Sequence, residues 1–340
     1  LHAIATMVFD SVAFKNVIST GLVLDAKGNK MSKHVGNVTN PFEMMEKYGA
    51  DPVRFYMMTN SEPWDNLKFD PEGVDECRRK FFGTLYNTYS FFALYANVDN
   101  YEIPAEGTPV LTEDATEIDR WIISKLNSLV DKVTAELENF DPTRAGRLID
   151  NFVNDDLSNW YVRLSRRRFW RSDDATDKLS AYQTLYTCLE TVTRLSSPIA
   201  PFFSDQLFQD LNNATQRNKA ESVHLTDFPI ANKSLIDKDL EERMEAAQLI
   251  SSMVLSLRKK ANIRVRQPLS KIMIPVASDS MKQQLEKVAN LIMSEVNIKD
   301  IKFLGADNNV LVKKIKPNFK TLGPRYGKLM KQIAALFAEM

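Results

Sequence analysis

The sequence predicts a mainly α-helical chain whose central part is an antiparallel helix bundle. An α/β segment precedes the bundle and a small α+β domain follows it. Three observations support this prediction. The 340 residues contain only 11 Gly, the residue that tight turns most often need. Asn-Pro and Asp-Pro pairs occur where helical periodicity begins, as at helix starts. Between residues 71 and 230 the helical stretches are long and the connections short, as in helix bundles.

Residues 1–70 mix helical and strand patterns. Residues 1–10 are apolar and typical of the end of a helix. Residues 16–25 are rich in β-branched side chains and are interrupted at Gly21, which predicts a strand and a return strand. Asn40-Pro41 and Asp51-Pro52 each predict a helix start with the acid or amide as N-cap. Residues 56–69 are predicted to be irregular.

The rest of the chain divides at about residue 230. Before it, helices are predicted to begin at residues 70–71, 112, 141–142, 178 and 201, with a linker at 97–109. After it, helices are predicted over 237–261, over 280–293 and from 323–324 onward, with strands over 271–276, 299–304 and 310–315. We therefore expect domains at 1–70, 71–230 and 231–340, the last of them truncated.

Composition excludes several classes of protein. No apolar run reaches the length needed to cross a bilayer, and no signal peptide is visible. Cys77 and Cys188 are the only cysteines and lie far apart, which excludes a Cys-based zinc site and a disulfide framework. Reduced cysteines fit the cytoplasm. We expect a cytoplasmic protein without a metal site in this chain and without a membrane partner.

The formal net charge of zero, from 44 basic and 44 acidic residues, conceals a segregation of charge. Residues 160–171, 255–271 and 313–331 contain 18 basic and no acidic side chains. The remainder has 26 basic and 44 acidic side chains, a net charge of −18. A single basic run usually faces water or pairs within the fold. Three such segments in an otherwise acidic chain favour a polyanionic partner such as nucleic acid.

Lys30 and Lys33 lie in a polar loop flanked by Gly28 and Gly36. Two lysines at this spacing are suited to holding phosphate oxygens as mobile point charges. In nucleotidyl transfer, such charges stabilise the leaving pyrophosphate. A solvated hairpin turn is the ordinary alternative for two lysines in a polar loop.

The string GLVLDAKGNKMSKHVGNVTNP at residues 21–41 resembles the KMSKS signature region of class I aminoacyl-tRNA synthetases. Four further strings extend the resemblance: KYGADPVRFYMM at 47–58, DDLSNWYVRLSRRRFW at 155–170, LRKKANIRVRQPLSKI at 257–272 and KPNFKTLGPRYG at 316–327. A fifth, SPIAPFFSDQLF, stands at 197–208. Together they are similar to the isoleucyl-tRNA synthetase family over essentially the whole chain. The valyl-tRNA synthetases are the nearest competitor.

This resemblance implies a function for the loop. Lys30, Met31, Ser32 and Lys33 would form the ATP loop, with Lys33 and Lys30 stabilising charge during adenylate formation. His34 stands where the signature has Ser, which leaves the local hydrogen bonding open. The implied substrates are Mg-ATP, isoleucine and tRNA(Ile), in a monomeric enzyme. Residues 1–70 would end the catalytic domain and contain a stem-contact segment, and the bundle would bind the anticodon.

The family's second ATP motif, HIGH, is not formed by any of the three histidines, His2, His34 and His224. No stretch is long enough for an amino-acid pocket or an editing domain, which isoleucine enzymes need because one methylene gives only ~1–3 kcal/mol of discrimination. We therefore expect a C-terminal fragment that does not catalyse aminoacylation alone.

A helical wheel through the bundle's basic segment assigns its side chains to faces. Trp160 falls on the core stripe, together with Ile149, Val153, Leu157 and Leu164. One flank carries Arg163, Arg166 and Trp170, the better candidates for tRNA contact because guanidinium groups reach phosphates and indoles stack on bases. Arg168 and Tyr161 share the other flank, with Tyr161 equally compatible with the core. Arg167 and Arg171 fall toward the core and are expected to form salt bridges.

Two further patches are candidate tRNA contacts. One contains Arg258, Lys259, Lys260, Arg264 and Arg266, at a helix end where positive charge also favours the helix dipole. The other contains Lys316, Lys320 and Arg325. Two other classes of function compete with a synthetase: a standalone RNA-binding helical module and a protein-interaction bundle. Neither would need a phosphate-binding loop next to α/β segments.

Overall fold

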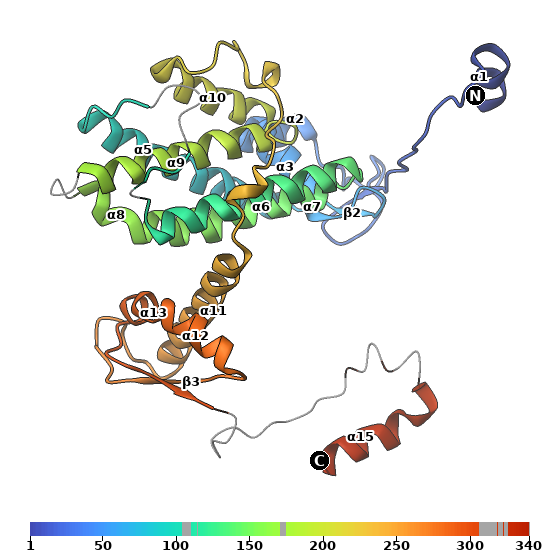
Figure 1. Ribbon diagram of the computed structural model, residues 1–340. Helices are drawn as coiled ribbons and strands as arrows, with labels where there is room; N and C mark the ends of the chain where they lie inside the picture. Colours follow the sequence, from blue (N-terminus) through green and yellow to red (C-terminus); the bar gives the residue numbers. More distant parts are fainter. Residues whose placement is uncertain are drawn as a thin grey trace. The chain divides into compact units, whose positions relative to one another are not determined.

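The computed structural model describes residues 1–103, 110–113, 115–170, 175–305, 318, 322 and 326–339. The chain is mainly helical, as predicted (Figure 1). It divides into two compact units, Leu1–Glu241 and Glu242–Met340, which are considered one at a time. Within the described ranges, no helix has the length and apolar character needed to cross a membrane.

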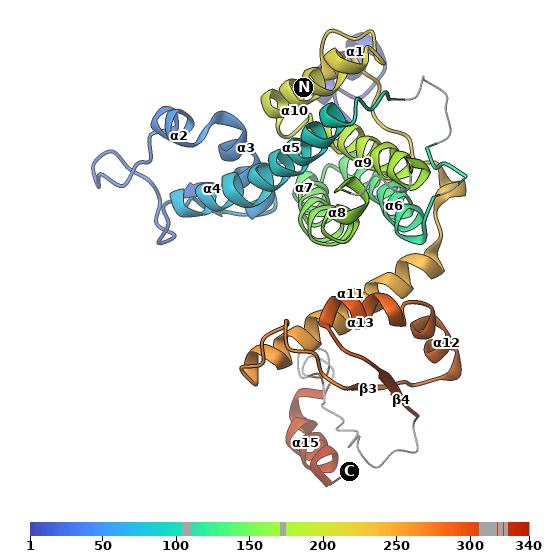
Figure 2. The same cartoon turned by 90° about the vertical axis from the view of Figure 1, so that its left-hand side faces the viewer.

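The first unit starts with short helices and a small parallel strand pair and continues into longer helices such as α5, α6 and α9 (Figure 2). In chain order its elements are α1 (His2–Phe9), β1 (Val23–Leu24), α2 (Pro41–Tyr48), α3 (Ala50–Asn60), β2 (Leu67–Lys68), α4 (Pro71–Cys77), the π-helix η1 (Arg78–Phe82), α5 (Gly83–Val98), α6 (Glu117–Glu138), α7 (Pro142–Asn151), the π-helix η2 (Phe152–Val162), α8 (Arg163–Trp170), α9 (Ala175–Ser196), α10 (Pro201–Thr215) and the short 3-10 turns η3 (Val223–Leu225) and η4 (Lys233–Leu235).

Three of the predicted helix starts are confirmed by their caps. The side chains of Asn40, Asp70 and Asp141 accept hydrogen bonds from backbone amides in the first turns of α2, α4 and α7. Each helix has Pro in its first turn, where a missing N–H costs nothing. The prediction that Asp51 is an N-cap is wrong, because α3 begins at Ala50 with Gly49 as its N-cap. The carboxylate of Asp51 is buried and instead accepts a hydrogen bond of 2.5 Å from the amide of Phe203, in the first turn of α10.

The expected return strand after Gly21 is also wrong. β1 pairs in parallel with β2, so its partner comes from more than forty residues further along the chain. The segment predicted to be irregular contains both the end of α3 and β2. Two-residue strands lack the periodicity that would mark them in a sequence, and a parallel partner need not be close in sequence.

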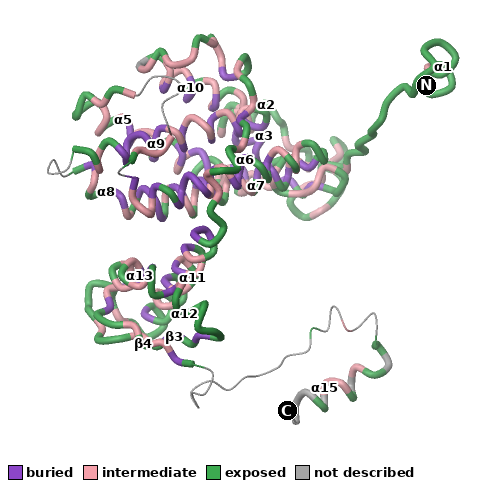
Figure 3. The backbone as a smooth tube through the Cα atoms, viewed as in Figure 1, coloured by how far each residue is buried: buried purple, intermediate pink, exposed green. Residues whose placement is uncertain are grey.

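The longer helices bury most of the unit's large side chains. The most deeply buried include Trp121 on α6, Tyr161 on η2, Tyr182 on α9 and Phe169 on α8. Figure 3 shows buried positions, in purple, along α6, α7 and α9. Helix α6 begins at Glu117 rather than near residue 112, because Thr116 and Asp119 form a capping box there.

The second unit combines helices with one pair of strands in its described part. Helix α11 (Lys238–Lys260) begins in the first unit and continues into the second, followed by β3 (Ile272–Pro275), α12 (Asp279–Lys287), α13 (Ala289–Val296), β4 (Ile301–Leu304), the 3-10 turn η5 (Gly327–Leu329) and α15 (Met330–Glu339). Strands β3 and β4 are parallel and in register from Ile272 opposite Ile301. The single helix predicted over 280–293 is two helices, separated at Val288. The strand predicted at 310–315 and the helix start at 323–324 lie outside the described residues.

Candidate functional site

The predicted phosphate-binding loop is a hairpin that starts from a tight turn at Asp25. The Asp25 carboxylate accepts hydrogen bonds from the amides of Lys27 at 3.0 Å and Asn29 at 2.7 Å. Leu24 and Lys30 then form an antiparallel bridge across the turn. Gly28 has a φ of 87°, a backbone conformation that residues other than glycine rarely adopt. The turn therefore fixes where the loop leaves β1.

Asn37 closes the hairpin from its far side. Its side-chain oxygen accepts a hydrogen bond of 2.8 Å from the amide of Ser32, and its Nδ2 donates to the Asp25 carboxylate at 2.9 Å and to the Lys30 carbonyl at 3.2 Å. The pKa of Asp25 is lowered, first by the Asn37 hydrogen bond and then by the Asn29 amide. The sequence analysis did not identify Asn37, although an amide next to Gly36, with φ of 72°, is a typical turn-closing pair.

The four loop residues then divide into anchors and free side chains. Met31 packs against the buried cluster of Val53, Tyr56, Leu67, Phe69 and Val74. Ser32 is half-buried, and its hydroxyl accepts a hydrogen bond from the amide of His34 at 3.3 Å. Because that bond uses the backbone of His34, replacing Ser by His at this position preserves it. Lys30 and Lys33 are exposed, with their ammonium groups available to an anion.

Contacts with the following segment position the hairpin. Leu22 donates its amide to the Asn66 side chain at 2.9 Å, and Gly21 donates to the Pro63 carbonyl at 2.9 Å. A Cβ atom at Gly21 would lie 2.1 Å from the carbonyl oxygen of Asp65. Only glycine therefore permits this approach. The tyrosine hydroxyl of Tyr56 donates to the Lys68 carbonyl at 3.0 Å and thus links β2 to α3.

Helix α3, from the expected stem-contact segment, is joined by hydrogen bonds to α7 and to the turn between α9 and α10. Arg54 donates to the carbonyls of Ile199 at 3.1 Å and Pro198 at 3.3 Å. Thr143 donates to the Met58 carbonyl at 2.7 Å. A Cβ at Gly146 would lie 2.5 Å from the Thr59 methyl group, so α7 and α3 approach closely. These contacts join the loop-bearing segment and the helices within one unit.

Two of the predicted tRNA contacts in the basic segment are wrong. Tyr161 is completely buried, and its hydroxyl donates to the Asp119 carboxylate at 2.7 Å. Arg168 donates two hydrogen bonds to the same carboxylate, at 2.8 and 2.7 Å, and a third to Asp177 at 2.8 Å. A buried phenol and a guanidinium used by two carboxylates are not available to RNA. The sequence analysis did not identify Asp119, which receives all of these bonds except the one to Asp177.

The opposite flank is exposed, as its wheel position predicts. Arg163 and Arg166 are exposed, and Trp170 has 57% of its surface exposed. The Nε of Arg163 donates to the Asn159 carbonyl at 2.7 Å, which fixes the direction of its guanidinium. Arg167, expected to face the core, is exposed as well. Trp160 is buried, as expected, and Arg171 lies outside the described residues.

In the second unit, Arg258 does not belong to the exposed patch. Only 3% of its surface is exposed, and its guanidinium donates to three backbone carbonyls. The prediction that it contacts tRNA is therefore wrong. Lys259, Lys260, Arg264 and Arg266 are exposed. The third predicted patch, Lys316, Lys320 and Arg325, lies outside the described residues.

Neither cysteine has the environment of a reactive thiol. Burial raises the pKa of Cys77 to about 11 and raises that of the completely buried Cys188 further. Across the part of the chain that the structure describes, no group of three His, Cys, Asp or Glu side chains is arranged to hold a metal ion.

Comparisons with known proteins agree on one family. A family model for class I tRNA synthetases (I, L, M and V) matches residues 1–70, and one for the anticodon-binding domain of tRNA ligases matches residues 119–274. Curated isoleucine–tRNA ligases from Bacteroides thetaiotaomicron and Cytophaga hutchinsonii are 61% and 56% identical over all 340 residues. The chain spans only 29% and 30% of their lengths.

A solved structure supports the fold alone. It is the ternary complex of Agrobacterium radiobacter K84 agnB2 LeuRS with tRNA and LeuAMS. It superimposes with a TM-score of 0.51 at 21% identity, covering 69% of this chain and 27% of that one.

Proposed function

Because the chain belongs to the isoleucine–tRNA ligase family of class I tRNA synthetases, we propose that its parent protein ligates isoleucine to tRNA(Ile). The reaction would consume Mg-ATP and pass through an isoleucyl-adenylate. Within it, this chain supplies the ATP loop and a tRNA-binding surface. The observation that carries the proposal is the hairpin at residues 25–37, which is closed by Asp25 and Asn37 and leaves two lysines exposed.

The role of the hairpin follows from its electrostatics. Adenylate formation breaks the bond between the α- and β-phosphates of ATP, so negative charge grows on the leaving pyrophosphate. Exposed ammonium groups on a loop with a fixed backbone stabilise that charge without ordering the loop at the same moment. Lys33 is the main candidate for this role and Lys30 the second. Met31 and Ser32 are the anchors that hold the backbone between Lys30 and Lys33 in place.

The first test replaces Lys33 by Ala in the intact enzyme. Loss of one such charge is expected to slow isoleucine-dependent pyrophosphate exchange by about 10²–10³-fold. ATP binding should change much less, because the charge develops in the transition state. Lys27→Ala is the matched control, since Lys27 is exposed on the same hairpin at its turn. Equal exchange rates in the Lys33 variant and the wild type would contradict the role.

The tRNA-binding part of the proposal rests on charge and exposure. Arg163 and Arg166 are exposed on α8, together with Trp170, which offers an indole face to an unpaired base. In the second unit, Lys259 and Lys260 end α11, and Arg264 and Arg266 follow in the next loop. Phosphate contacts by such side chains supply most of the affinity for RNA. Lys316, Lys320 and Arg325 remain candidates for the same role from the sequence.

The domain organisation is part of the proposal. Residues 1–70 would end the catalytic domain, residues 71–230 would form the antiparallel anticodon-binding bundle, and residues 231–340 would form a small α+β domain. The matches to an anticodon-binding model and a class I model support this order. A valyl enzyme and a standalone RNA-binding module are not favoured, because full-length matches of the chain are to isoleucine–tRNA ligases. We also propose a monomer in the cytoplasm, a reducing compartment that the free cysteines fit.

A further inference from the structure

The loop that connects α11 to β3 is organised around one buried arginine. The guanidinium of Arg258 donates to the carbonyls of Arg264 at 3.1 Å, Gln267 at 3.0 Å and Asn297 at 3.0 Å. Two of these carbonyls belong to the loop itself, and the third belongs to the residue that ends α13. A planar guanidinium with several donors can hold three carbonyls at fixed angles, which a lysine ammonium does less well.

A second set of hydrogen bonds closes the loop from α13. The Nδ2 of Asn297 donates to the Val265 carbonyl at 2.8 Å, and the amide of Leu269 donates to the Asn297 carbonyl at 3.2 Å. Asn262 and Asn297 both have positive φ, at 55° and 52°, and mark the two sharp changes of direction. The backbone of residues 262–269 is therefore fixed at both ends and in the middle.

This arrangement directs the loop's carbonyls inward and its basic side chains outward. The carbonyls of Arg264 and Gln267 accept hydrogen bonds from the buried Arg258 and that of Val265 from Asn297, whereas the side chains of Arg264 and Arg266 are exposed. Inward carbonyls remove partial negative charge from the outer surface, which favours an approaching anion.

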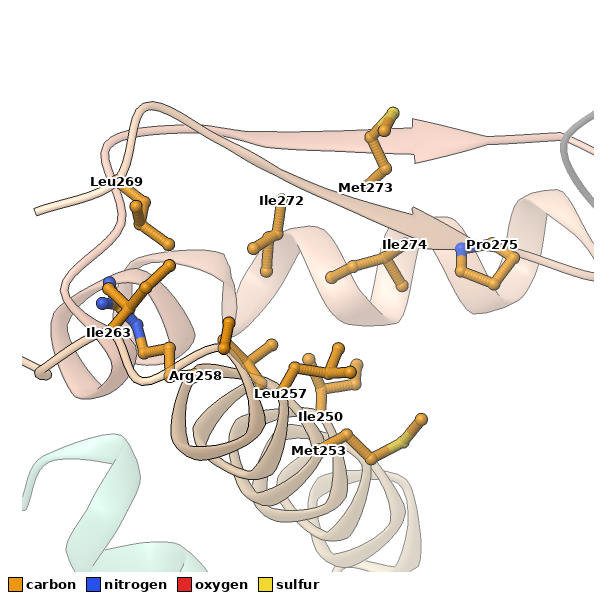
Figure 4. A pocket seen from close by; sticks show the side chains of 12 residues that line it. Ile250, Met253, Leu257, Arg258, Ile263, Leu269, Ile272, Met273, Ile274 and Pro275 are labelled. Carbon is orange, nitrogen blue, oxygen red and sulfur yellow. The ribbon is translucent and has the colours of Figure 1, made fainter.

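The burial of Arg258 is not explained by packing alone. It lies at one end of a mainly apolar cavity of about 390 Å³, beside Ile263 and Leu269, where Ile272 and Ile274 extend from β3 toward α11 (Figure 4). Its Nε is buried and, within the described part of the chain, has no hydrogen-bond partner. Burying a cation with an unused donor disfavours folding. An apolar side chain would fill this space at a lower desolvation cost, so another role accounts for the arginine.

We infer that Arg258 is a positioning residue for RNA: it holds residues 262–269 in the conformation that presents Arg264 and Arg266 to phosphates. The inference rests on the proposed tRNA-binding function and adds to it a residue that does not itself touch the RNA. Its consequence is energetic coupling. The contribution of Arg258 to binding is realised only through the two exposed arginines.

The test is a double-mutant cycle on the intact protein with an unmodified tRNA(Ile) transcript. Replacing Arg264 and Arg266 together by Ala should weaken binding by at least about tenfold, as expected for lost charged hydrogen bonds. Arg258→Met should weaken it by a similar factor. In the Arg264→Ala, Arg266→Ala background, Arg258→Met should change affinity by less than twofold, because contacts already lost cannot be lost again. Amide exchange should accelerate at residues 262–269 in the Arg258 variant.

Controls separate positioning from charge and from unfolding. Lys282→Met removes one exposed positive charge from the same unit without touching the loop, and should leave affinity within twofold of the wild type. If Arg258→Met does not fold, the double-mutant cycle is repeated with Arg258→Lys. This variant keeps the positive charge and loses part of the hydrogen-bond geometry to the three carbonyls. In the intact enzyme, the Arg258 variant should raise the KM for tRNA and leave kcat unchanged.

The outcomes are distinct. Two results would overturn the positioning role while leaving the proposed function intact. In the first, the effects of the Arg258 and Arg264/Arg266 replacements on tRNA affinity multiply. In the second, Arg258→Met binds tRNA as the wild type does although the Arg264/Arg266 replacement binds it more weakly. If replacing Arg264 and Arg266 leaves tRNA affinity unchanged, this loop is not part of the tRNA surface. That result would overturn both the positioning role of Arg258 and the proposed tRNA contacts of Arg264 and Arg266.

Discussion

At the scale of single residues, Asp119 is the polar centre of the first unit. Its carboxylate is fully buried and accepts hydrogen bonds from Thr116, Tyr161, Arg168 and Ser180. These donors come from the start of α6, from η2, from α8 and from α9, so one side chain joins four elements. Burial by itself would raise the pKa of Asp119, but the hydrogen bonds and charge of Arg168, with those of Tyr161 and Thr116, lower it overall.

The lowered pKa predicts how stability depends on pH. A carboxylate with a folded-state pKa below its ordinary 3.8 stabilises the fold above that pH, and the contribution disappears as pH falls through the folded value. Asp119→Asn should therefore lower the free energy of unfolding by about 3 kcal/mol at pH 7. The difference from the wild type should narrow below about pH 4.

Urea unfolding between pH 7 and pH 2.5 measures this difference. Asp131→Asn, which removes an exposed carboxylate from the same helix, is the control and should give a small difference at every pH. A difference for Asp119→Asn that stays constant across the acid range would show that its carboxylate is not the group responsible.

At the scale of elements, the π-helix η2 decides which side chains of the basic segment are buried. Buried residues recur at every fourth position from Val153 to Phe169, passing through Leu157, Tyr161 and Ser165. In a regular α-helix this spacing would drift around the helix by 40° at each step. Eleven residues of wider π-helix absorb the drift and keep one face inward. A wheel drawn with 100° steps therefore places Arg168 on an outer flank and Arg167 toward the core, and it leaves Tyr161 between flank and core.

The strand pair β1–β2 gives a second prediction at this scale. Gly21→Ala would place a Cβ within 2.1 Å of the Asp65 carbonyl, so the backbone of β1 must move away from its partner segment. We expect a loss of about 1–3 kcal/mol in stability. In the intact enzyme, pyrophosphate exchange should also fall, because β1 leads directly into the lysine hairpin.

Gly83→Ala is the matched control. A Cβ at Gly83 meets only ordinary contact at 3.5 Å, inside a helix where Ala is favoured over Gly by about 1 kcal/mol. Differential scanning calorimetry should show it unchanged or stabilised. If Gly21→Ala behaved in the same way, the close approach to Asp65 would not constrain the hairpin.

At the scale of the whole molecule, the distribution of charge matters more than its sum. The described basic residues of the second unit's patch and of α8 remain exposed after folding, apart from the two arginines that the structure uses internally, Arg168 and Arg258. Acidic side chains occupy the rest of the chain, which has a net charge of −18 once the three basic segments are set aside. A neutral protein of this kind attracts a polyanion at selected surfaces and repels it elsewhere.

This distribution predicts a steep dependence of tRNA binding on salt. Each phosphate contact adds about 0.7 to 0.9 to the slope of log affinity against log salt concentration. Arg163→Ala combined with Arg166→Ala should weaken binding and reduce the slope by about 1.5, without lowering the melting temperature, because both side chains are exposed. Filter binding over a salt series measures the affinity and the slope, and a thermal melt measures the melting temperature.

The control replaces Lys132 and Lys282, two exposed lysines outside the basic segments, and should leave the slope unchanged. A melting temperature that falls in proportion to the affinity would make Arg163 and Arg166 structural residues. Heparin that binds as tightly as tRNA(Ile) would argue against a specific tRNA surface.

Features formed within a few residues of chain were predictable from the sequence. The caps at Asn40, Asp70 and Asp141, the turn at Asp25 and the exposed lysines at positions 30 and 33 all follow from side chains acting on their own backbone neighbourhood. The same local strings carried the resemblance to class I synthetases. Such local interactions can be predicted from the sequence because their partners are close together in the chain.

The features that only the tertiary structure decided depend on partners far apart in sequence. β1 pairs with a strand more than forty residues away, Asp51 caps a helix 150 residues later, and Asp119 and Arg168 meet across the unit. Which arginine of a basic run is buried depends on the rotation of its helix, and a π-helix changes that rotation without a signature in composition. The sequence therefore determined which functional groups this chain carries, and tertiary packing determined which of those side chains are exposed at the surface.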